Sequence, residues 1–272
     1  MVEIENSIIT ISALREQQTR ECLESIFKYT DEGYEVIIVD VGSYPNTIEW
    51  LKSLEQTKDN LKLIFNRKSQ GISVARNHGI EVAGGEYVVF MDNDVIVTED
   101  WLEELVEVAS SSEKIGMVGS KILRMDDLVH FYSGYMATDF DEKGNLKGMG
   151  LRWLIPYKRY APEVSIQEDV EWYPTTCLLA KRAIVQKIGG FDEFLLTCEE
   201  DKDLCLRVRR SGYRIVYCPR SEVYHNHDYS KVNREDEYHK KFRLRTGQAA
   251  KNQAYFRKKW NCEIIFENKL DY

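Results

Sequence analysis

EYVVFMDNDV, residues 86–95, is the stretch of sequence that decides the fold. It begins with a short apolar run that ends at Met91, which is typical of a buried strand. Three polar residues, Asp92, Asn93 and Asp94, follow the run directly. In open α/β sheets, ligands bind beyond the carboxyl ends of the strands. We therefore expect these polar side chains to lie in a ligand-binding crevice.

Short apolar runs alternate with amphipathic segments on both sides of this stretch. We predict strands at 7–12, 34–40, 61–66, 86–92 and 115–123, and helices around 22–27, 48–54, 72–83 and 101–108. Such alternation is the pattern of βαβ units. The predicted fold class is α/β, with a Rossmann-like mixed, mainly parallel sheet flanked by helices, in a single compact domain with a C-terminal helical extension.

Length and composition predict a globular, soluble protein. The chain has 272 residues, 43% of them hydrophobic, which is enough for an ordinary core. The N-terminus has no basic region followed by a long apolar stretch, and no segment approaches the ~18 apolar residues of a membrane span. Six cysteines are scattered without a CxxC pair, so we expect reduced, mostly buried thiols in a cytoplasmic protein.

Charge is unevenly distributed along the chain. The net charge of −8 argues against general affinity for nucleic acid. Residues 228–260 nevertheless hold ten Lys or Arg against four Asp or Glu. One interpretation is peripheral contact of this basic segment with the inner face of a membrane or with an anionic acceptor, and the other is a solvated helix.

Asp92 and Asp94 suit a metal ion. Side chains two residues apart on an extended strand point to the same face, so the two carboxylates can converge while Asn93 turns away. Mg²⁺ and Mn²⁺ bind one or two carboxylates and complete their shell with water and substrate phosphates. The alternative is that these short acids only stabilise a turn.

The order of several motifs resembles that of the inverting glycosyltransferases of family two, which have the GT-A fold. The resemblance covers roughly residues 6–228 and runs through SIITIS (7–12), EVIIVDVGS (35–43), GISVARNHG (71–79), EYVVFMDNDV (86–95), GGFDEFLLTCEEDKDLCLRVRRSGY (189–213) and VYHNH (223–227). It implies transfer of a sugar from a nucleotide-diphosphate donor, for which we expect a UDP-sugar. The implied cofactor is Mn²⁺ or Mg²⁺, and the implied acceptor is a saccharide, a lipid-linked saccharide or a peptide.

The resemblance assigns donor-binding roles to the first half. Asp40 matches the acid that hydrogen-bonds the nucleotide base, whereas the residue type alone favours an acid that caps its own loop. Arg76 and Asn77 match positions that face the donor nucleotide. An arginine near a helix start can pair with phosphate, the alternative being a surface arginine.

The resemblance also assigns residues to the metal and the diphosphate. Asp94 matches the principal metal ligand, and Asp92 the acid nearest the ribose and sugar, with Asn93 between them. His225 matches a histidine that contacts the metal or diphosphate, and His227 lies two residues further on.

The segment at 199–204 matches the acidic motif of the catalytic half. Its acidic core is Glu200-Asp201, and the resemblance makes Asp201 the general base that takes the acceptor proton. The competing interpretation is that these acids suit the first turn of a helix through Leu204 and Val208.

Three departures from the family pattern leave the sugar open. ISALREQ (11–17) stands where family members often read P-T-Y-N, and Val41 where Asn is common. Thr175 and Thr176 replace a small pair and are candidates for contact with donor sugar or acceptor.

We divide the chain into a nucleotide-sugar-binding half (1–115), an acceptor-binding and catalytic half (116–228) and a basic C-terminal helical extension (229–272). Trp153 and Trp172 are candidates to stack on sugar rings, or are core residues. Phe242, Ala249 and Phe256 recur at seven-residue spacing, which predicts one face that packs on the body or docks at a lipid surface.

Two other functions fit parts of the sequence. DNDV also fits the strand end of haloacid-dehalogenase-type phosphatases, although that chemistry needs the motif after an early strand and leaves the upstream pattern unexplained. A catalytically inactive nucleotide-sugar-binding module is the other alternative, but a mere binder has no need of a base.

Overall fold

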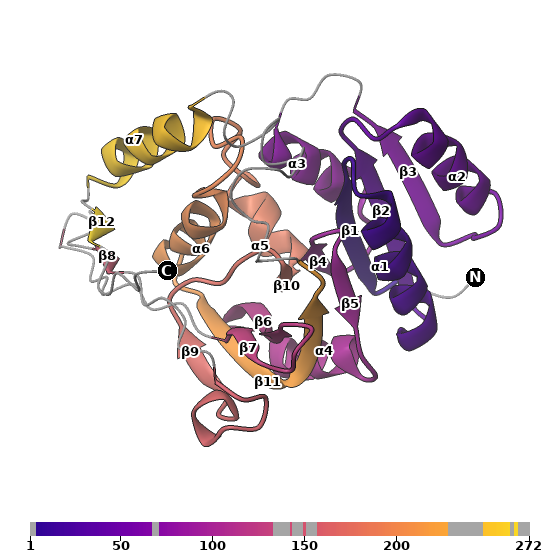
Figure 1. The fold of residues 1–272 in the computed structure, drawn as a ribbon. Coiled ribbons are helices and arrows are strands. Elements are labelled where there is room, and N and C mark those ends of the chain that lie inside the picture. The colour runs from indigo at the N-terminus through magenta and orange to yellow at the C-terminus, as the bar shows by residue number, and fades with distance from the viewer. Residues whose placement is uncertain are drawn as a thin grey trace.

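A single large mixed sheet runs through the molecule and is flanked by helices (Figure 1). The computed structural model describes residues 4–66, 71–132, 157–227 and 247–261, with the short pieces 142, 149–150 and 264–265. The strand order in the large sheet is β3 (Leu61–Phe65), β2 (Tyr34–Asp40), β1 (Asn6–Ser12), β4 (Tyr87–Met91), β10 (Cys177–Lys181), β6 (Ile115–Leu123), β11 (Arg214–His225) and β5 (Val95–Val97). This confirms the predicted α/β class.

The N-terminal part of the sheet is parallel. A helix lies between each two successive strands in sequence, which is usual for the crossover between parallel strands. The elements are β1 (Asn6–Ser12), α1 (Glu16–Tyr29), β2 (Tyr34–Asp40), α2 (Pro45–Glu55), β3 (Leu61–Phe65), α3 (Ile72–Val82) and β4 (Tyr87–Met91). All four predicted strands of this part are confirmed, and each strand's carboxyl end points to one edge.

The second part introduces antiparallel strands. β10 (Cys177–Lys181) lies between β4 and β6 (Ile115–Leu123) and is antiparallel to both. β11 (Arg214–His225) is parallel to β6, and β5 (Val95–Val97) is antiparallel to the end of β11. The sheet therefore continues across residue 115, and the two predicted halves share it.

The remaining elements include two further strands of the large sheet, which pair with β6 and β11. They are α4 (Trp101–Ser110), β7 (Val129–Phe131), the 3₁₀ helix η1 (Pro162–Val164), β9 (Glu168–Val170), α5 (Arg182–Lys187), α6 (Glu200–Arg210) and α7 (Gln248–Trp260), with a separate pair β8 (Met149–Gly150) and β12 (Ile264–Ile265). No strand was predicted at the positions of β5, β7, β9, β10 and β11. The first three are only three residues long, too short for a period-2 pattern to show.

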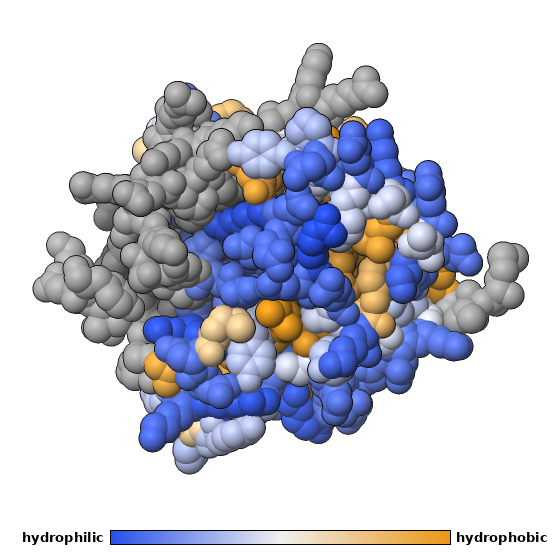
Figure 2. Space-filling model, turned by 45° about the vertical axis from the view of Figure 1, so that its right-hand side comes forward, coloured by the Kyte–Doolittle hydropathy of each residue, from blue (hydrophilic) through white to orange (hydrophobic). Residues whose placement is uncertain are grey.

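The core is built from the central strands. Every residue of β4 and β6 is buried, as expected of strands covered on both faces. Large fully buried side chains, including Trp101, Tyr173 and Tyr217, fill the space between sheet and helices. On the face drawn in Figure 2, hydrophobic side chains of the described residues form small areas between hydrophilic ones.

The cysteines and the apolar character of the helices can be compared with what the sequence led us to expect. Five cysteines are free thiols, four of them buried, which confirms the expected thiols there, while Cys262 lies outside the described residues. Burial raises the pKa of Cys177 and Cys205 to about 12. Among the described helices, none combines the length and the apolar composition needed to cross a bilayer.

The C-terminal extension contains the expected helix, α7, and one face of this helix is buried. Asn252, Phe256 and Trp260 are buried, a four-residue spacing that faces the body of the protein. Ala249 is only half-buried, and Phe242 and Trp153 lie outside the described residues. Phe256 therefore lies on the buried face, as expected for packing on the body, and Ala249, seven residues or about two turns before it, lies on the same side of the helix.

Gly79 provides a test of how closely α3 packs on the sheet. A Cβ at this position would lie 2.5 Å from Cγ2 of the buried Ile9 on β1. We expect Gly79→Ala to lower the free energy of unfolding by about 1–3 kcal/mol, measured by urea denaturation, because overpacking outweighs the better helix propensity of alanine. In the control Gly84→Ala the new Cβ would lie 3.4 Å from its nearest neighbour, Glu35 Oε1, an ordinary contact. Equal effects of the two substitutions would contradict the packing described.

Candidate functional site

Asp94 lies in a tight turn between β4 and β5. The strand that precedes it ends at Met91, and residues 93–94 form the turn before Val95. The extended geometry expected for Asp92 and Asp94 is therefore wrong, and the two carboxylates have different hydrogen-bonding partners. Asp94 is buried, with 3% of its surface exposed.

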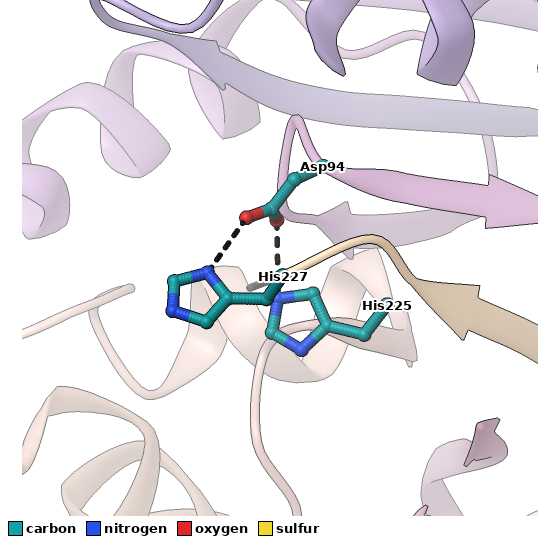
Figure 3. Close-up of side chains that lie close together, drawn as sticks. All are labelled: Asp94, His225 and His227. Atoms are coloured by element: carbon teal, nitrogen blue, oxygen red, sulfur yellow. Dashed lines mark hydrogen bonds and ion pairs between the residues drawn. The ribbon is translucent and has the colours of Figure 1, made fainter. Parts of the chain in front are cut away.

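The end of β11 brings two histidines to Asp94. The antiparallel register pairs His225 with Val95, and the backbone N–H of Asn226 donates to the Asp94 carbonyl at 2.7 Å. His225 Nε2 lies 3.1 Å from Asp94 Oδ1, and His227 Nδ1 lies 3.3 Å from Oδ2 (Figure 3). A strand register thus joins two motifs that are more than 120 residues apart.

The ionised form of Asp94 is strongly favoured. Burial alone would raise its pKa, but His225, His227 and Arg15 together hold the pKa of this carboxyl well below its usual range. Burial in turn would lower the pKa of His225, but the Asp94 carboxylate raises it, with a smaller contribution from Asp92. The site is therefore a buried carboxylate stabilised by surrounding donors.

Asp94, His225 and His227 fit a divalent cation. One ligand atom from each lies within 4.8 Å of the others. Carboxylate oxygen and imidazole nitrogen are both common metal ligands in proteins. Asp94 and His225 were expected as ligands from the sequence, and His227 joins them in this cluster.

Arg15 is a site residue that the sequence analysis missed. It precedes α1 and forms an ion pair with Asp94 Oδ2, and its Nη1 lies 3.3 Å from His227 Nδ1. It belongs to ISALREQ, the segment noted only as a departure from the family. Its position just beyond the end of β1 was the available signal, since the same reasoning selected Asp40 at the end of β2.

Asp92 faces the second half of the protein. The register of β10 places Thr176 beside it, and the Thr176 hydroxyl donates to Asp92 Oδ2 at 3.0 Å. Arg76 Nη2 lies 3.5 Å from Asp92 Oδ1. About a third of the Asp92 side chain is exposed, so a ligand in solution can reach this carboxylate.

Arg76 joins the two acidic motifs. Its side chain is buried on α3, and Nη1 donates to Glu200 Oε1 at 3.2 Å while Nη2 faces Asp92. The guanidinium also lies 5.2 Å from the centre of the Phe191 ring, within the range of a cation–π contact. The surface-arginine alternative is thus wrong. One buried cation holds DND and EED together.

Glu199, Glu200 and Asp201 begin α6. Cys198 and Glu199 have left-handed backbone conformations (φ 64° and 69°), which are uncommon for residues other than glycine. Glu200 is buried, and its Oε2 has no partner among the described residues. Lys202 Nζ donates to Glu199 Oε2 at 2.9 Å. Strained backbone and an unpartnered buried carboxylate oxygen are typical of functional sites.

Asp201 is partly exposed in the first turn of α6. Burial of its carboxyl, followed by repulsion from Glu200, raises the pKa of Asp201 to about 7. A carboxylate that titrates near neutral pH is well suited to accept and release a proton. The helix-capping interpretation is compatible with this position, but it does not account for the raised pKa.

Three other predicted site residues form hydrogen bonds with neighbouring groups of the protein. Asp40 accepts hydrogen bonds from the N–H groups of Gly42 and Ser43, at 3.3 and 3.1 Å, as the loop-capping alternative expected. Asn77 holds the loop after Gly190 through Phe191 N and O, at 2.8 and 3.0 Å. Asn93 Nδ2 donates to Thr19 Oγ1 at 2.8 Å, so this side chain points to α1.

Two aromatic residues adjoin the site. The ring of His130 on β7 lies 5.7 Å from that of His225, and burial, followed by the charge of the neighbouring histidines, lowers the pKa of His130 to about 3. The sequence analysis missed it because β7 was not recognised. Trp172 is buried beneath Lys202, whose Nζ lies 5.4 Å from the ring, which favours the core interpretation for this tryptophan.

The fold and the site together define an α/β protein with a cluster of acidic and histidine side chains at the carboxyl ends of its strands. The sequence profile described as Glycosyl transferase family 2 matches residues 7–189. The chain belongs to this family.

This chain is similar to three proteins of known sequence and matches a different share of the length of each. Uncharacterized protein y4gI of Sinorhizobium fredii is 29% identical over 89% of this chain and 26% of its own length. Glycosyltransferase AglE of Haloferax volcanii is 25% identical over 74% of this chain and 60% of its own. N-acetylglucosaminyl-diphospho-decaprenol L-rhamnosyltransferase of Mycobacterium tuberculosis is 27% identical over 76% and 71%. The chain thus spans less than two thirds of the first two.

Solved structures share the fold. GalNAc-T7 with UDP, GalNAc and Mn²⁺ superposes with a TM-score of 0.64 at 17% identity, over 82% of this chain and 44% of that one. A mannosyltransferase from Pyrobaculum calidifontis in complex with GDP-Man and Mn²⁺ gives 0.61 at 17% identity, over 84% and 59%. These similarities support the GT-A fold that the sequence led us to expect.

Arg76→Met tests the bridge between the acidic motifs. The substitution keeps an apolar stem of similar length but leaves Glu200 buried beside Asp92 without the cation. We expect it to lower the free energy of unfolding by about 3–5 kcal/mol, measured by chemical denaturation. The control Arg20→Met removes a half-exposed ion pair with Glu16 and should cost less than about 1 kcal/mol. Arg76→Met combined with Glu200→Gln should recover part of the loss, and a purely additive loss would contradict the bridge.

Proposed function

We propose that this protein is a metal-dependent inverting glycosyltransferase that moves a sugar from a nucleotide-diphosphate donor to an acceptor hydroxyl. The observation that carries the proposal is the convergence of the DND and EED motifs on Arg76. Asp92, two residues before the proposed metal ligand Asp94, and Glu200, next to the proposed base Asp201, are thereby held together. The family match removes the phosphatase alternative, since it accounts for the segments upstream of DNDV as well.

Asp94, His225 and His227 are the residues proposed to hold the cation, with Asp92 beside them. When bound, a divalent cation would offset the negative charge that develops on the departing nucleoside diphosphate. Mg²⁺ prefers oxygen ligands, so a cluster with two imidazoles favours Mn²⁺ of the two. The solved structures with Mn²⁺ support this choice.

Asp201 is the proposed general base. Its carboxylate takes the proton of the acceptor hydroxyl as that oxygen attacks the anomeric carbon from the side opposite the diphosphate, and the bond from carbon to diphosphate breaks. Burial is the main cause of the raised pKa of Asp201, and Glu200 supports this role because its negative charge raises that pKa further. A carboxylate of high pKa is the stronger base once it is ionised.

We propose that the residues expected to bind the donor do so from their observed positions. Asp40, at the end of β2, orders the loop 41–43 and would contact the nucleotide base from there. Arg76 and Arg15 are the cations of the proposed donor site. Asn77 and Asn93 contribute indirectly, because their side chains hydrogen-bond Phe191 and Thr19 of the protein itself. A UDP-sugar is the proposed donor, and GDP-sugars are the first alternative to test.

The acceptor is proposed to be a saccharide, a lipid-linked saccharide or a peptide. The name of the mycobacterial relative, a transferase to a diphospho-decaprenol-linked sugar, supports the lipid-linked class. Lys251, Arg257 and Lys258 are exposed on the outer face of α7, which supports peripheral contact with an anionic membrane surface. In that arrangement the protein would work at the cytoplasmic face of the membrane.

Asp201→Asn should abolish transfer and spare donor binding. We expect the rate of transfer to fall by at least ~10²-fold while calorimetric binding of UDP with Mn²⁺ persists. In the wild type, the rate should rise with pH through the pKa of about 7, because only the ionised carboxylate accepts a proton, and this dependence should disappear in the variant. Asp169→Asn, an exposed acid paired with Arg214, is the control and should transfer normally. Normal turnover by Asp201→Asn would rule out this base.

Asp94→Ala should remove metal-dependent donor binding. We expect calorimetry to show tighter UDP binding on addition of Mn²⁺ for the wild type and no such gain for the variant. The exposed control Asp126→Ala should behave like the wild type. Unchanged Mn²⁺-dependent affinity in Asp94→Ala would contradict the metal site. Mn²⁺-dependent binding of UDP-, GDP- and dTDP-sugars by the wild type without release of nucleoside diphosphate would favour the inactive binding module instead.

A further inference from the structure

The C-terminal helix α7 contacts the segment that carries the proposed base. Its buried face consists of Asn252, Phe256 and Trp260. Two of these residues are aromatic, as expected of packing against a core, but Asn252 is a polar side chain with no exposed surface. A fully buried amide is costly to bury unless each of its groups is hydrogen-bonded. The partners of Asn252 therefore indicate what this position is for.

Asn252 binds the backbone just before the acidic motif. Its Nδ2 donates to the carbonyl oxygens of Thr197 and Cys198, the latter at 3.3 Å. Its Oδ1 accepts a hydrogen bond from Gln248 Nε2 at 2.8 Å, which fixes the orientation of the amide. A single side chain thus holds two successive peptide groups more than 50 residues away in the sequence.

The peptide groups held in this way lead directly into the strained turn. Cys198 and Glu199 have left-handed backbone conformations, and Glu200 and Asp201 follow at the start of α6. Such conformations persist only where surrounding contacts hold them. The Asn252 amide supplies such contacts at the carbonyls on the N-terminal side of the turn.

Other residues of α7 hold the ends of the same segment. Tyr255 donates to Asp192 Oδ2 at 2.9 Å, and Lys259 Nζ lies 2.6 Å from Asp192 and 2.7 Å from Asp203. Trp260 Nε1 donates to Asp203 Oδ1 at 2.9 Å. α7 therefore contacts the segment 192–203 before, at and after its turn. Figure 1 shows α7 beside α6.

We propose that Asn252 is a positioning residue for catalysis, which sets the placement of Glu200 and Asp201 through the backbone of Thr197 and Cys198. The inference rests on the proposed function, because it gives the C-terminal extension a part in placing the general base. The extension is then part of the catalytic unit, beyond the part of the chain that the family profile matches.

Asn252→Leu tests this proposal, because it keeps the volume of the side chain and removes both donated hydrogen bonds. We expect kcat for transfer to fall by about 10–100-fold, since a displacement of catalytic groups by about 1 Å has effects of this size. Mn²⁺-dependent binding of UDP, measured by calorimetry, should stay within about twofold of wild type. The amide hydrogens of residues 197–203 should exchange faster in the variant.

Phe256→Leu is the matched control, a substitution on the same buried face that leaves the Asn252 contacts in place. It should lower the melting temperature and leave kcat and the exchange of residues 197–203 close to wild type. A purely structural role of α7 predicts parallel effects of both substitutions, which would overturn the proposal. Unchanged kcat in Asn252→Leu would also overturn it.

The exchange measurement separates this proposal from the proposed function. If the wild type transfers no sugar from any donor, the proposed function fails, and hydrogen exchange in the protein without substrate still decides whether Asn252 holds the turn. Unchanged exchange of residues 197–203 in Asn252→Leu would then refute the positioning role on its own.

Discussion

The rest of the site depends on the ion pairs that the buried guanidinium of Arg76 forms with Asp92 and Glu200. Asp92 at the end of β4, about a third exposed, and the buried Glu200 at the start of α6 are acidic residues from different parts of the chain. Without a cation between them, their repulsion and desolvation would favour separation of the two segments. Arg76 pairs with both acids and thereby holds the DND and EED motifs together.

Strand register provides the second constraint. β10 runs antiparallel beside β4 and places Thr176 on Asp92, and the end of β11 runs antiparallel beside β5 and places two histidines on Asp94. A shift of one residue in either pairing would turn these side chains to the other face of the sheet. The well-buried core strands therefore determine the geometry of the polar site, and α7 adds a further attachment at the turn before Glu200.

Much of this arrangement could be predicted from the sequence, and the missing parts share a physical reason. Apolar runs and helical spacing indicated the N-terminal parallel strands and their helices, and the acids at strand ends indicated the crevice. Arg15, Asn252 and the pairing of β10 depend on contacts between distant segments, which leave no local pattern in the sequence. Asp92 and Asp94 were expected to converge because the segment was taken as extended, whereas the turn at Asn93 gives each carboxylate different partners.

A crystal structure with UDP and Mn²⁺ tests the central claim most directly, namely that these separate acids serve one donor site. The anomalous signal of manganese should lie between Asp94, His225 and His227, with the diphosphate beside Asp92 and the carboxylate of Asp201 facing the open side of the donor. A manganese ion bound elsewhere, or a nucleotide held away from both acidic motifs, would contradict the account.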